Sequence, residues 1–226
     1  MNHLLDNPVY HALCTGNQHL GYGSKQAKYF DEAVSPFAGF AEGYAQGFDD
    51  LYHLLPPART ILYATPQQLE EPPGWELRQA IEGLQLVFDA GTAVVPSYPL
   101  IPLQQAHIPE MIALARLTQP GPFSTRTIDF GRYYGIFANE QLVAMTGQRL
   151  HLPPFAEVSA VCTHPDHLGK GYAAALVQQV VGLILQDGET PFLHVRADNR
   201  RAIDLYERLG FSVRGPMNFY VLKRKA

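Results

Sequence analysis

Residues 157–173 read EVSAVCTHPDHLGKGYA. The first seven residues predict a strand over 157–163, and the apolar residues after position 172 recur at helical spacing as far as about Gln186. Two glycines, Gly169 and Gly171, lie in the loop between the two elements. The first N–H groups of a helix have no intrahelical partner, and glycines let an anion approach the backbone closely. This stretch therefore predicts a binding site for a phosphate group.

Three kinds of phosphate site compete for this loop. A P-loop needs Gly-x4-Gly-Lys-Ser/Thr, and the residues around Gly171 do not supply it. The pattern Gly169-x-Gly171-x-x-Ala174, with Glu189 downstream, fits the dinucleotide fingerprint and keeps a nucleotide-dependent oxidoreductase open. The chain lacks the repeated strand–helix units of a Rossmann domain, however. The third interpretation is a site for the pyrophosphate of coenzyme A.

A second motif, NRRAIDLYERLGF, occupies residues 199–211. It predicts an amphipathic helix that ends at Gly210. In this order and spacing, the two motifs resemble those of the GNAT superfamily of acyl-CoA-dependent N-acyltransferases, over residues 99–226. The resemblance implies an α/β fold with a mixed, mostly antiparallel sheet flanked by helices. It also implies acetyl-CoA as the co-substrate.

The resemblance assigns the coenzyme contacts residue by residue. The strand backbone at Val161, Cys162 and Thr163 would pair with the pantetheine arm, and Asn199 would also contact that arm. The pyrophosphate cradle would consist of Leu168, Gly169, Lys170, Gly171, Tyr172 and Ala173. The family pattern begins with Arg or Gln where this chain has Leu168. One side-chain contact to the phosphates is therefore lost, while the backbone amides remain.

Two further residues match catalytic positions of the family. Tyr206 matches the tyrosine that protonates the departing thiolate, and Glu157 matches a carboxylate that acts as general base through water. For Tyr206 the alternative is a core aromatic on an amphipathic helix, and we favour the acid role. Glu157 is equally an ion-pair partner or a solvent-facing carboxylate. Arg149 and the Tyr133–Tyr134 pair are candidates for the acceptor side and equally for a face of the sheet, and no role is assigned to them.

The expected function is direct acetyl transfer from acetyl-CoA to a primary amine of a small molecule or an amino-acid-like acceptor. The alternative is an acyl-CoA-binding sensor or interaction module without turnover. Cys162, His164 and His167 form a Cys-x-His-x-x-His pattern, but no fourth zinc ligand is evident, so no metal is expected. We interpret Cys162 as a small buried strand residue rather than a nucleophile.

Composition limits the other function classes. The chain has 226 residues, with 17 basic and 21 acidic side chains, so general nucleic-acid binding is not expected. Its longest apolar runs are far shorter than the ~20 residues of a membrane span. With only two cysteines, it has no disulfide framework, and we expect a cytoplasmic protein. The oligomeric state stays open, with a homodimer as one candidate.

Charge is unevenly distributed along the chain. Residues 194–226 carry eight basic and three acidic side chains, which favours an anionic ligand near this segment. The remaining residues are acidic overall, which weakly favours a cationic amine as the acceptor.

The first half of the chain carries no comparable motif. We predict a helix over 35–55, because apolar residues there recur every three to four positions, and a strand over 59–64. Residues 75–88 fit either a helix or a strand. Prolines cluster around residue 98, where we place the boundary between a divergent N-terminal GNAT-like domain, 1–98, and a GNAT acetyltransferase domain, 99–226.

Within the second domain, the pattern predicts a short edge strand over 100–103 and a helix over 108–117. Strands are expected over 133–138 and 141–149, joined as a hairpin by Asn139 and Glu140, and over 191–195. The chain is expected to close with a second hairpin, around residues 214–216.

Overall fold

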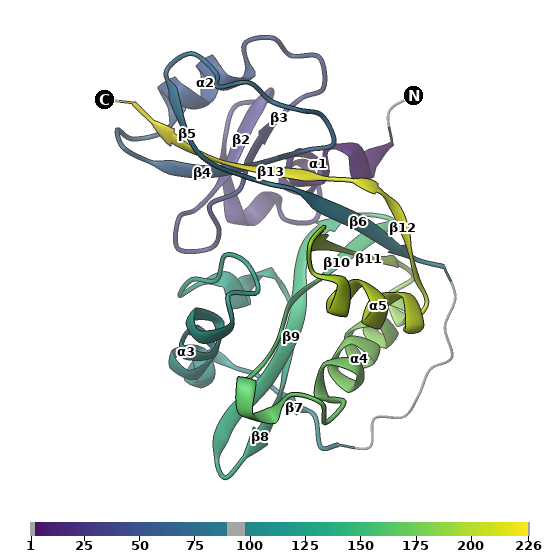
Figure 1. Cartoon of the computed structure of the whole chain (residues 1–226). Coiled ribbons are helices and arrows are strands. Elements are labelled where there is room, and N and C mark those ends of the chain that lie inside the picture. Colours follow the sequence, from purple (N-terminus) through teal and green to yellow (C-terminus); the bar gives the residue numbers. More distant parts are fainter. Residues whose placement is uncertain (1–2, 90–97, 226) are drawn as a thin grey trace.

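Seven strands form the largest sheet, in the order β12-β6-β11-β10-β9-β8-β7 (Figure 1). The computed structural model describes residues 3–89 and 98–225. The strands of this sheet are β6 (Gly83–Phe88), β7 (Ile101–Pro102), β8 (Tyr133–Ala138), β9 (Gln141–Leu152), β10 (Phe155–Thr163), β11 (Thr190–Arg196) and β12 (Phe211–Pro216). Only β10 and β11 pair in parallel, and the other neighbours in the sheet are antiparallel. The predicted α/β class with a mostly antiparallel sheet is confirmed.

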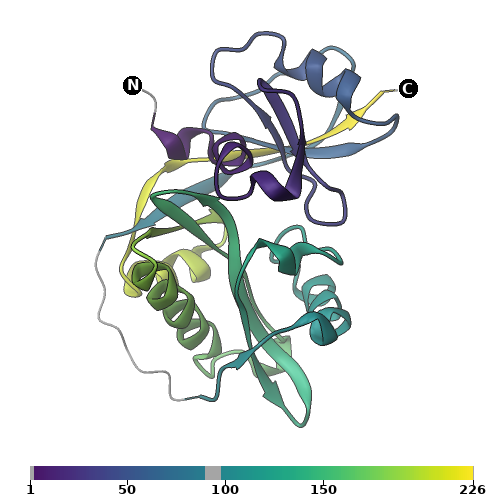
Figure 2. The ribbon, with the colours of Figure 1, turned by 180° about the vertical axis from the view of Figure 1, so that it is seen from behind.

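Helices cover both faces of this sheet. They are α3 (Ile108–Thr118), α4 (Tyr172–Gln186) and α5 (Arg200–Arg208). The apolar side of α3 packs with Met145 and Cys162, whereas α4 and α5 pack with Val158 and Leu193. Figures 1 and 2, which view the molecule from opposite sides, place α3 and α4 on either side of β9. The three predicted helices of the second half are therefore confirmed.

Two smaller three-stranded sheets lie at the other end of the molecule. One has the order β1-β2-β3 and the other β4-β13-β5. Their strands are β1 (Gly21–Gly23), β2 (Ala27–Phe30), β3 (Ala38–Phe40), β4 (Thr60–Thr65), β5 (Trp75–Ile81) and β13 (Asn218–Arg224). Helices α1 (Pro8–Cys14) and α2 (Gly47–Leu54) belong to the same end.

A long antiparallel ribbon joins the two ends of the molecule. Residues 75–88 form β5 and β6, which pair in turn with β13 and β12 over residues 211–224. One end of the ribbon completes the seven-stranded sheet, and the other end completes the sheet β4-β13-β5 (Figure 1). The ambiguous segment 75–88 is thus strand throughout, apart from a break at Glu82.

The expected hairpin around residues 214–216 is wrong. Strand β12 pairs with β6, and β13 pairs with β4 and β5, so the chain continues forward through Met217 instead of turning back. Met217 is fully buried and packs in the core beside Phe219, which keeps the chain inside the ribbon.

The expected helix over 35–55 is also wrong for most of its length. The segment contains β3 and the short helix α2 instead. A side chain on Gly47 would lie 2.2 Å from the Phe40 ring, and Gly43 has a φ of +72°. These glycines therefore serve close packing and a turn between two elements. The apolar residues still reach the core, but they do so from more than one element.

Both ranges of the predicted domain division contribute strands to shared sheets. Strand β6, from the first range, lies between β11 and β12, and β13, from the second, lies between β4 and β5. The sheets therefore do not divide at residue 98, because each of the two ranges supplies a strand to a sheet built mainly by the other range. Part of the expected linker, residues 90–97, falls outside the described residues.

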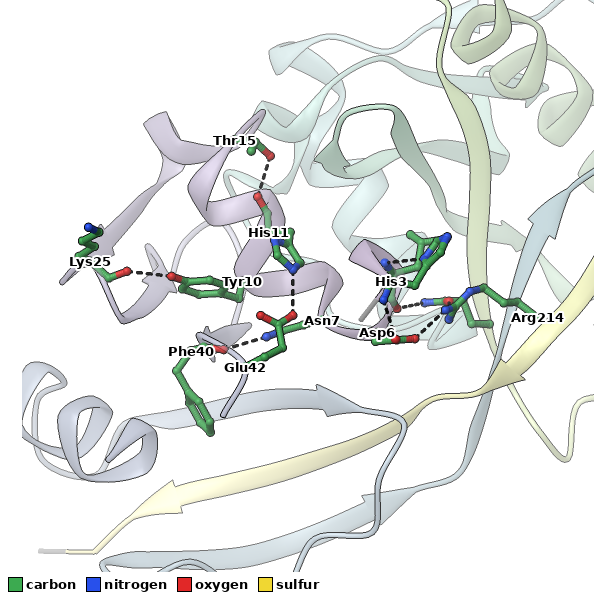
Figure 3. A network of polar contacts seen from close by, with 12 residues as sticks. His3, Asp6, Asn7, Tyr10, His11, Thr15, Lys25, Phe40, Glu42 and Arg214 are labelled. Atoms are coloured by element: carbon green, nitrogen blue, oxygen red, sulfur yellow. Dashed lines mark hydrogen bonds and ion pairs between the residues drawn. The ribbon is translucent and has the colours of Figure 1, made fainter. Parts of the chain in front are cut away.

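Polar contacts fasten the N-terminal segment to these sheets (Figure 3). Asn7 Nδ2 donates to the Phe40 carbonyl at 2.8 Å, next to the start of α1. On the opposite side of the segment, Arg214 of β12 donates to Asp6 at 2.6 Å. The beginning of the chain is thus held against the edge strand of the large sheet.

None of the helices in the described ranges combines the length and the apolar character needed to cross a membrane.

Candidate active site

The centre of the large sheet contains a gap between two strands. Strands β10 and β11 pair only from Phe155 to Glu157, opposite Thr190 to Phe192. Beyond Glu157 they diverge, and residues of both strands line a cavity of about 510 Å³. Parallel strands that separate leave backbone N–H and C=O groups without ladder partners, and such groups can pair with an extended ligand.

A bulge in β10 shapes the wall of this gap. The register with β9 shifts between Ser159 and Cys162, and Ala160 has a φ of +54°. A non-glycine residue in the left-handed region is uncommon, and bulges often adjoin active sites. The bulge directs Val161 towards the side of α4 and α5, while Cys162 packs on the side of α3.

The predicted phosphate loop lies at the mouth of the same cavity. Leu168 is 47% exposed, and Gly169 and Gly171 both have a φ of +79°. A Cβ added at Gly169 would meet no atom within 4 Å, so the space above the loop is open. The Tyr98 hydroxyl donates to the Lys170 carbonyl at 2.5 Å and so fixes the backbone of the loop at this residue.

The N-terminus of α4 is free to bind an anion. No side chain in the described part of the protein caps this helix, whose N-cap residue is Gly171. The first-turn amides at Tyr172 and Ala173 therefore keep their N–H groups and the positive end of the helix dipole. Lys170 and the exposed Arg201 and Arg208 line the same cavity, in agreement with the expected anionic ligand near the C-terminal segment.

Tyr206 lies on α5 and lines the cavity, and it belongs to the same apolar cluster as Val158 and Val161 of β10. The residue is 6% exposed, and its hydroxyl makes no hydrogen bond to any side chain or backbone group in the described ranges. Burial, together with the neighbouring Cys162, raises the pKa of Tyr206. The hydroxyl therefore stays protonated at neutral pH and is available as a proton donor.

Asn199, also a lining residue, has a structural task in addition to the expected coenzyme contact. Its Oδ1 accepts a hydrogen bond from the Ala202 amide at 3.2 Å and caps helix α5. The Asn199 Nδ2 group has no partner among the described residues. The side chain can therefore cap the helix through Oδ1 and, at the same time, donate to a ligand through Nδ2.

Glu157 is the most tightly held ionisable residue of the site. Its side chain is fully buried and accepts hydrogen bonds from Arg149 Nη2 at 2.5 Å and Arg149 Nε at 2.7 Å. His194 Nδ1 lies 2.7 Å from Glu157 Oε1. Burial raises the pKa of Glu157, but the charge and hydrogen bonds of Arg149, helped by His194, outweigh burial and lower it to about 2. A carboxylate held in this way accepts a proton poorly, so the geometry does not favour the expected base role.

The polar chain behind Glu157 continues to the molecular surface. Gln85 Nε2 lies 2.9 Å from His194 Nε2, and Gln85 Oε1 accepts from Arg214, which pairs with Asp6. Because Gln85 Nε2 is a donor, His194 accepts at Nε2 and donates from Nδ1 to Glu157. His194 and Gln85 were not among the residues predicted from the sequence. The signal was present, since each is a polar residue inside an otherwise apolar strand.

Cys162 is 6% exposed, and burial raises the pKa of its thiol to about 11, against smaller opposing hydrogen bonds from Thr118 and the Met145 backbone. A buried thiol with a high pKa is a poor nucleophile. Within the described ranges, no group of three or more His, Cys, Asp or Glu side chains is arranged to hold a metal ion.

A second cavity, of about 290 Å³, adjoins the first. The two share a wall that includes Gln119, Arg149 and His194. The far wall comes from the other end of the molecule and includes Phe37 of the segment before β3 and Phe219 of β13. This wall could not be predicted from the sequence, because it is assembled from segments far apart in the chain.

Comparisons with known proteins agree with this arrangement. Residues 133–220 match the family described as FR47-like protein. No curated protein matches the sequence. A GCN5-related N-acetyltransferase from Kribbella flavida, 13% identical, superposes with a TM-score of 0.65 over 96% of this chain and 95% of its own. A GCN5-related N-acetyltransferase-like protein from Streptococcus suis, 16% identical, superposes with a TM-score of 0.56 over 89% of this chain and 82% of its own. These two share the fold.

A crystal structure from Novosphingobium aromaticivorans, assigned to the GNAT family of acetyltransferases, is 36% identical and covers 100% of both chains, with a TM-score of 0.90. Its identity and coverage extend the likeness beyond the two sequence motifs to the N-terminal half. The chain therefore belongs to the GNAT family.

Proposed function

We propose that this protein transfers the acetyl group of acetyl-CoA to a primary amine of a small molecule. The observation that carries the proposal is the cavity at the gap between β10 and β11, with an uncapped helix N-terminus at its mouth and Tyr206 in its wall.

The residues present fit coenzyme A. Gly169 and Gly171 leave the loop without side chains where phosphates would approach, and the first turn of α4 offers free amides. Thr163 Oγ1 is buried and has no partner in the described part of the chain, as expected of a group that a ligand completes. The diverging backbone from Val161 to Thr163 would hold the pantetheine arm, and Asn199 would donate to it.

When bound, acetyl-CoA supplies the acetyl group as a thioester: a C–N bond forms, the C–S bond breaks, the amine nitrogen loses one proton, and the thiolate sulfur gains one. In this proposal the Tyr206 hydroxyl gives the proton to the sulfur, which is supported by its place in the cavity lining and its raised pKa. Backbone N–H groups of β10 near Val161, which lines the cavity, would donate to the oxygen that gains negative charge.

Glu157 acts in this proposal as a positioning residue. Its two oxygens hold the Arg149 guanidinium and the His194 ring, and both of these groups line the shared wall of the two cavities. The proton of the acceptor amine would pass to water, because the cavity opens to solvent beside the exposed Arg196 and Arg201.

Thiol release tests this proposal. The purified protein is mixed with acetyl-CoA and a set of primary amines, and free coenzyme A is followed with a thiol reagent while the acetylated product is identified by mass. We expect amine-dependent thiol release that is faster than hydrolysis of acetyl-CoA alone. Binding of acetyl-CoA without thiol release for any amine would favour the sensor alternative instead.

A further inference from the structure

The 290 Å³ cavity is the place where an acceptor would sit, if the proposed function holds. It shares Arg149, His194 and Val195 with the cavity assigned to the coenzyme, so a molecule inside it would face the gap between β10 and β11. Its volume of about 290 Å³ lies just below the roughly 300–1,000 Å³ that is typical of small-molecule sites. A small acceptor therefore fits better than a protein side chain on a folded domain.

Apolar and polar residues both line this cavity, and no acid is among the described lining residues. Phe37, Leu62, Ile81 and Phe219 form one side, and prolines from the segment after α3 form another. The charged groups in the lining are basic: Arg149 and Arg196, of which the exposed Arg196 is already paired with Asp198. A cationic amine would thus find no carboxylate in the lining, because Glu157 and Asp198, which pair with the two arginines, are not lining residues. A lining without an acid argues against the cationic acceptor that the acidic balance of residues 1–193 favours.

The guanidinium of Arg149 has one edge left for a ligand. Its Nε and Nη2 donate to the two oxygens of Glu157. Its Nη1 makes no hydrogen bond to the described residues, and a Cβ added at Gly121 would lie 3.9 Å from it, so Nη1 faces the segment that lines the cavity. A guanidinium has five N–H donors, and the end formed by Nη1 and Nη2 can bind a second carboxylate.

Packing holds this edge in place. The Arg149 guanidinium carbon lies 4.9 Å from the centre of the Phe37 ring, and the Arg149 side chain is only 10% exposed. An arginine that is clamped by Glu157 on one edge and by an aromatic ring on its face has little rotational freedom to lose on binding. Phe37 comes from the N-terminal half, which gives that half a direct part in the site.

We propose that the acceptor is a small apolar amino acid, that Arg149 binds its carboxylate, and that its side chain lies against Phe37, Leu62, Ile81 and Phe219. The proposal rests on the proposed acetyl transfer and adds the class of acceptor to it. It makes Arg149 the residue that selects amines carrying a carboxylate.

The test uses the unaltered protein and changes the acceptor. Leucine and phenylalanine are compared with their amides, leucinamide and phenylalaninamide, and with the corresponding amines that lack the carboxylate, isoamylamine and phenethylamine. Each kcat/KM is corrected for the fraction of neutral amine at the assay pH. Because hydrogen bonds to charged groups are strong, we expect kcat/KM to fall roughly 10- to 100-fold when the carboxylate is removed.

Arg149→Lys gives the reciprocal test, with the exposed Arg116→Lys as a control. Lysine keeps the charge beside Glu157 but has no second edge, so KM for leucine should rise while the preference for leucine over leucinamide disappears. Equal or faster transfer to the amides or the simple amines by the unaltered protein would overturn the proposal and leave acetyl transfer standing. Acetyl-CoA binding with no transfer to any amino acid would also overturn it. Failure of every amine together with failure to bind acetyl-CoA would refute the proposed function itself.

Discussion

Glu157→Gln is expected to destabilise the protein strongly, although it changes only one oxygen to an amide nitrogen. Glu157 is 0% exposed, and Arg149 is 10% exposed, with 2.5 and 2.7 Å hydrogen bonds between them. Glutamine cannot neutralise the guanidinium, and its Nε2 would face one of the Arg149 donors. Removing one partner of a buried ion pair costs about 3–5 kcal/mol, because the other charge stays buried without compensation.

This cost is large enough to measure by thermal unfolding. For chains of 150–250 residues, 1 kcal/mol corresponds to about 2–4 °C, so the expected fall in Tm is about 6–20 °C. The matched control is Asp198→Asn, which breaks the Arg196–Asp198 pair. Its contact is similarly short, at 2.6 Å, but its side chains are 57% and 68% exposed. Exposed pairs contribute about 0–1 kcal/mol, so the control should lose no more than a few degrees.

The same pair predicts how stability depends on pH. Burial raises the pKa of Glu157 and Arg149 lowers it, with a net fall from its usual 4.5 to about 2. A carboxylate whose pKa is lowered by folding stabilises the folded state above its unfolded pKa, and this contribution is lost as the pH falls. We therefore expect the unaltered protein to lose stability between about pH 4.5 and 2, and Glu157→Gln to lose less over that range. If Glu157→Gln unfolded within about 2 °C of the unaltered protein at pH 7, the description of a buried, charged pair would be refuted.

Three further predictions concern the coenzyme site and its neighbours. Tyr206→Phe should lower kcat by about 100-fold or more, while the Kd for acetyl-CoA stays within a factor of about three, because only the proton donor is lost. Stopped-flow turnover would measure kcat, and calorimetry would measure Kd. Leu168→Arg should tighten acetyl-CoA binding by about 3- to 10-fold, since Leu168 is 47% exposed at the phosphate loop and arginine adds a charged donor; an unchanged Kd would place the phosphates elsewhere. At neutral pH, Cys162 should react with a thiol reagent far more slowly than the partly exposed Cys14, because Cys162 is buried and its pKa is raised to about 11; mass analysis of the labelled peptides would show which thiol reacts first.

The second half of the fold could be predicted because its signals are local. The strand before Gly169, the helix after Gly171 and the helix over 200–208 each have their own periodicity and end signals, and all three are present. The turn at Asn139 and Glu140 likewise joins β8 and β9, with both residues at positive φ.

The helix expected over residues 35–55 of the first half was wrong for a physical reason. Apolar residues at helical spacing over 35–55 predict a helix, but the glycines within this segment bring backbone close to neighbouring elements, such as Gly39 beside Tyr10. Periodicity cannot distinguish one long helix from a strand, a turn and a short helix that share a core. The final ribbon was missed in the same way, because its pairing is with strands more than a hundred residues earlier.

The candidate site also contains parts that local motifs predict and parts that depend on packing between distant segments. The loop and Tyr206 were predicted from motifs, and the structure brings them to one cavity. The partners of Glu157 were not predicted, because Arg149 and His194 reach it across three neighbouring strands. The acceptor wall formed by Phe37 and Phe219 depends on the packing of both halves, which no local pattern encodes.

The most direct test of the coenzyme site is the rise in Tm that acetyl-CoA produces in three proteins. At 100 times its Kd, a ligand stabilises the folded state by about 2.7 kcal/mol, or about 5–10 °C for a chain of this size. We expect this rise in the unaltered protein and in Gly182→Glu, which adds the same charge on α4 where a Cβ meets no atom within 4 Å. Gly171→Glu, which places bulk and negative charge in the phosphate loop, should show no rise. An equal rise in Gly171→Glu would contradict the placement of the coenzyme at this loop.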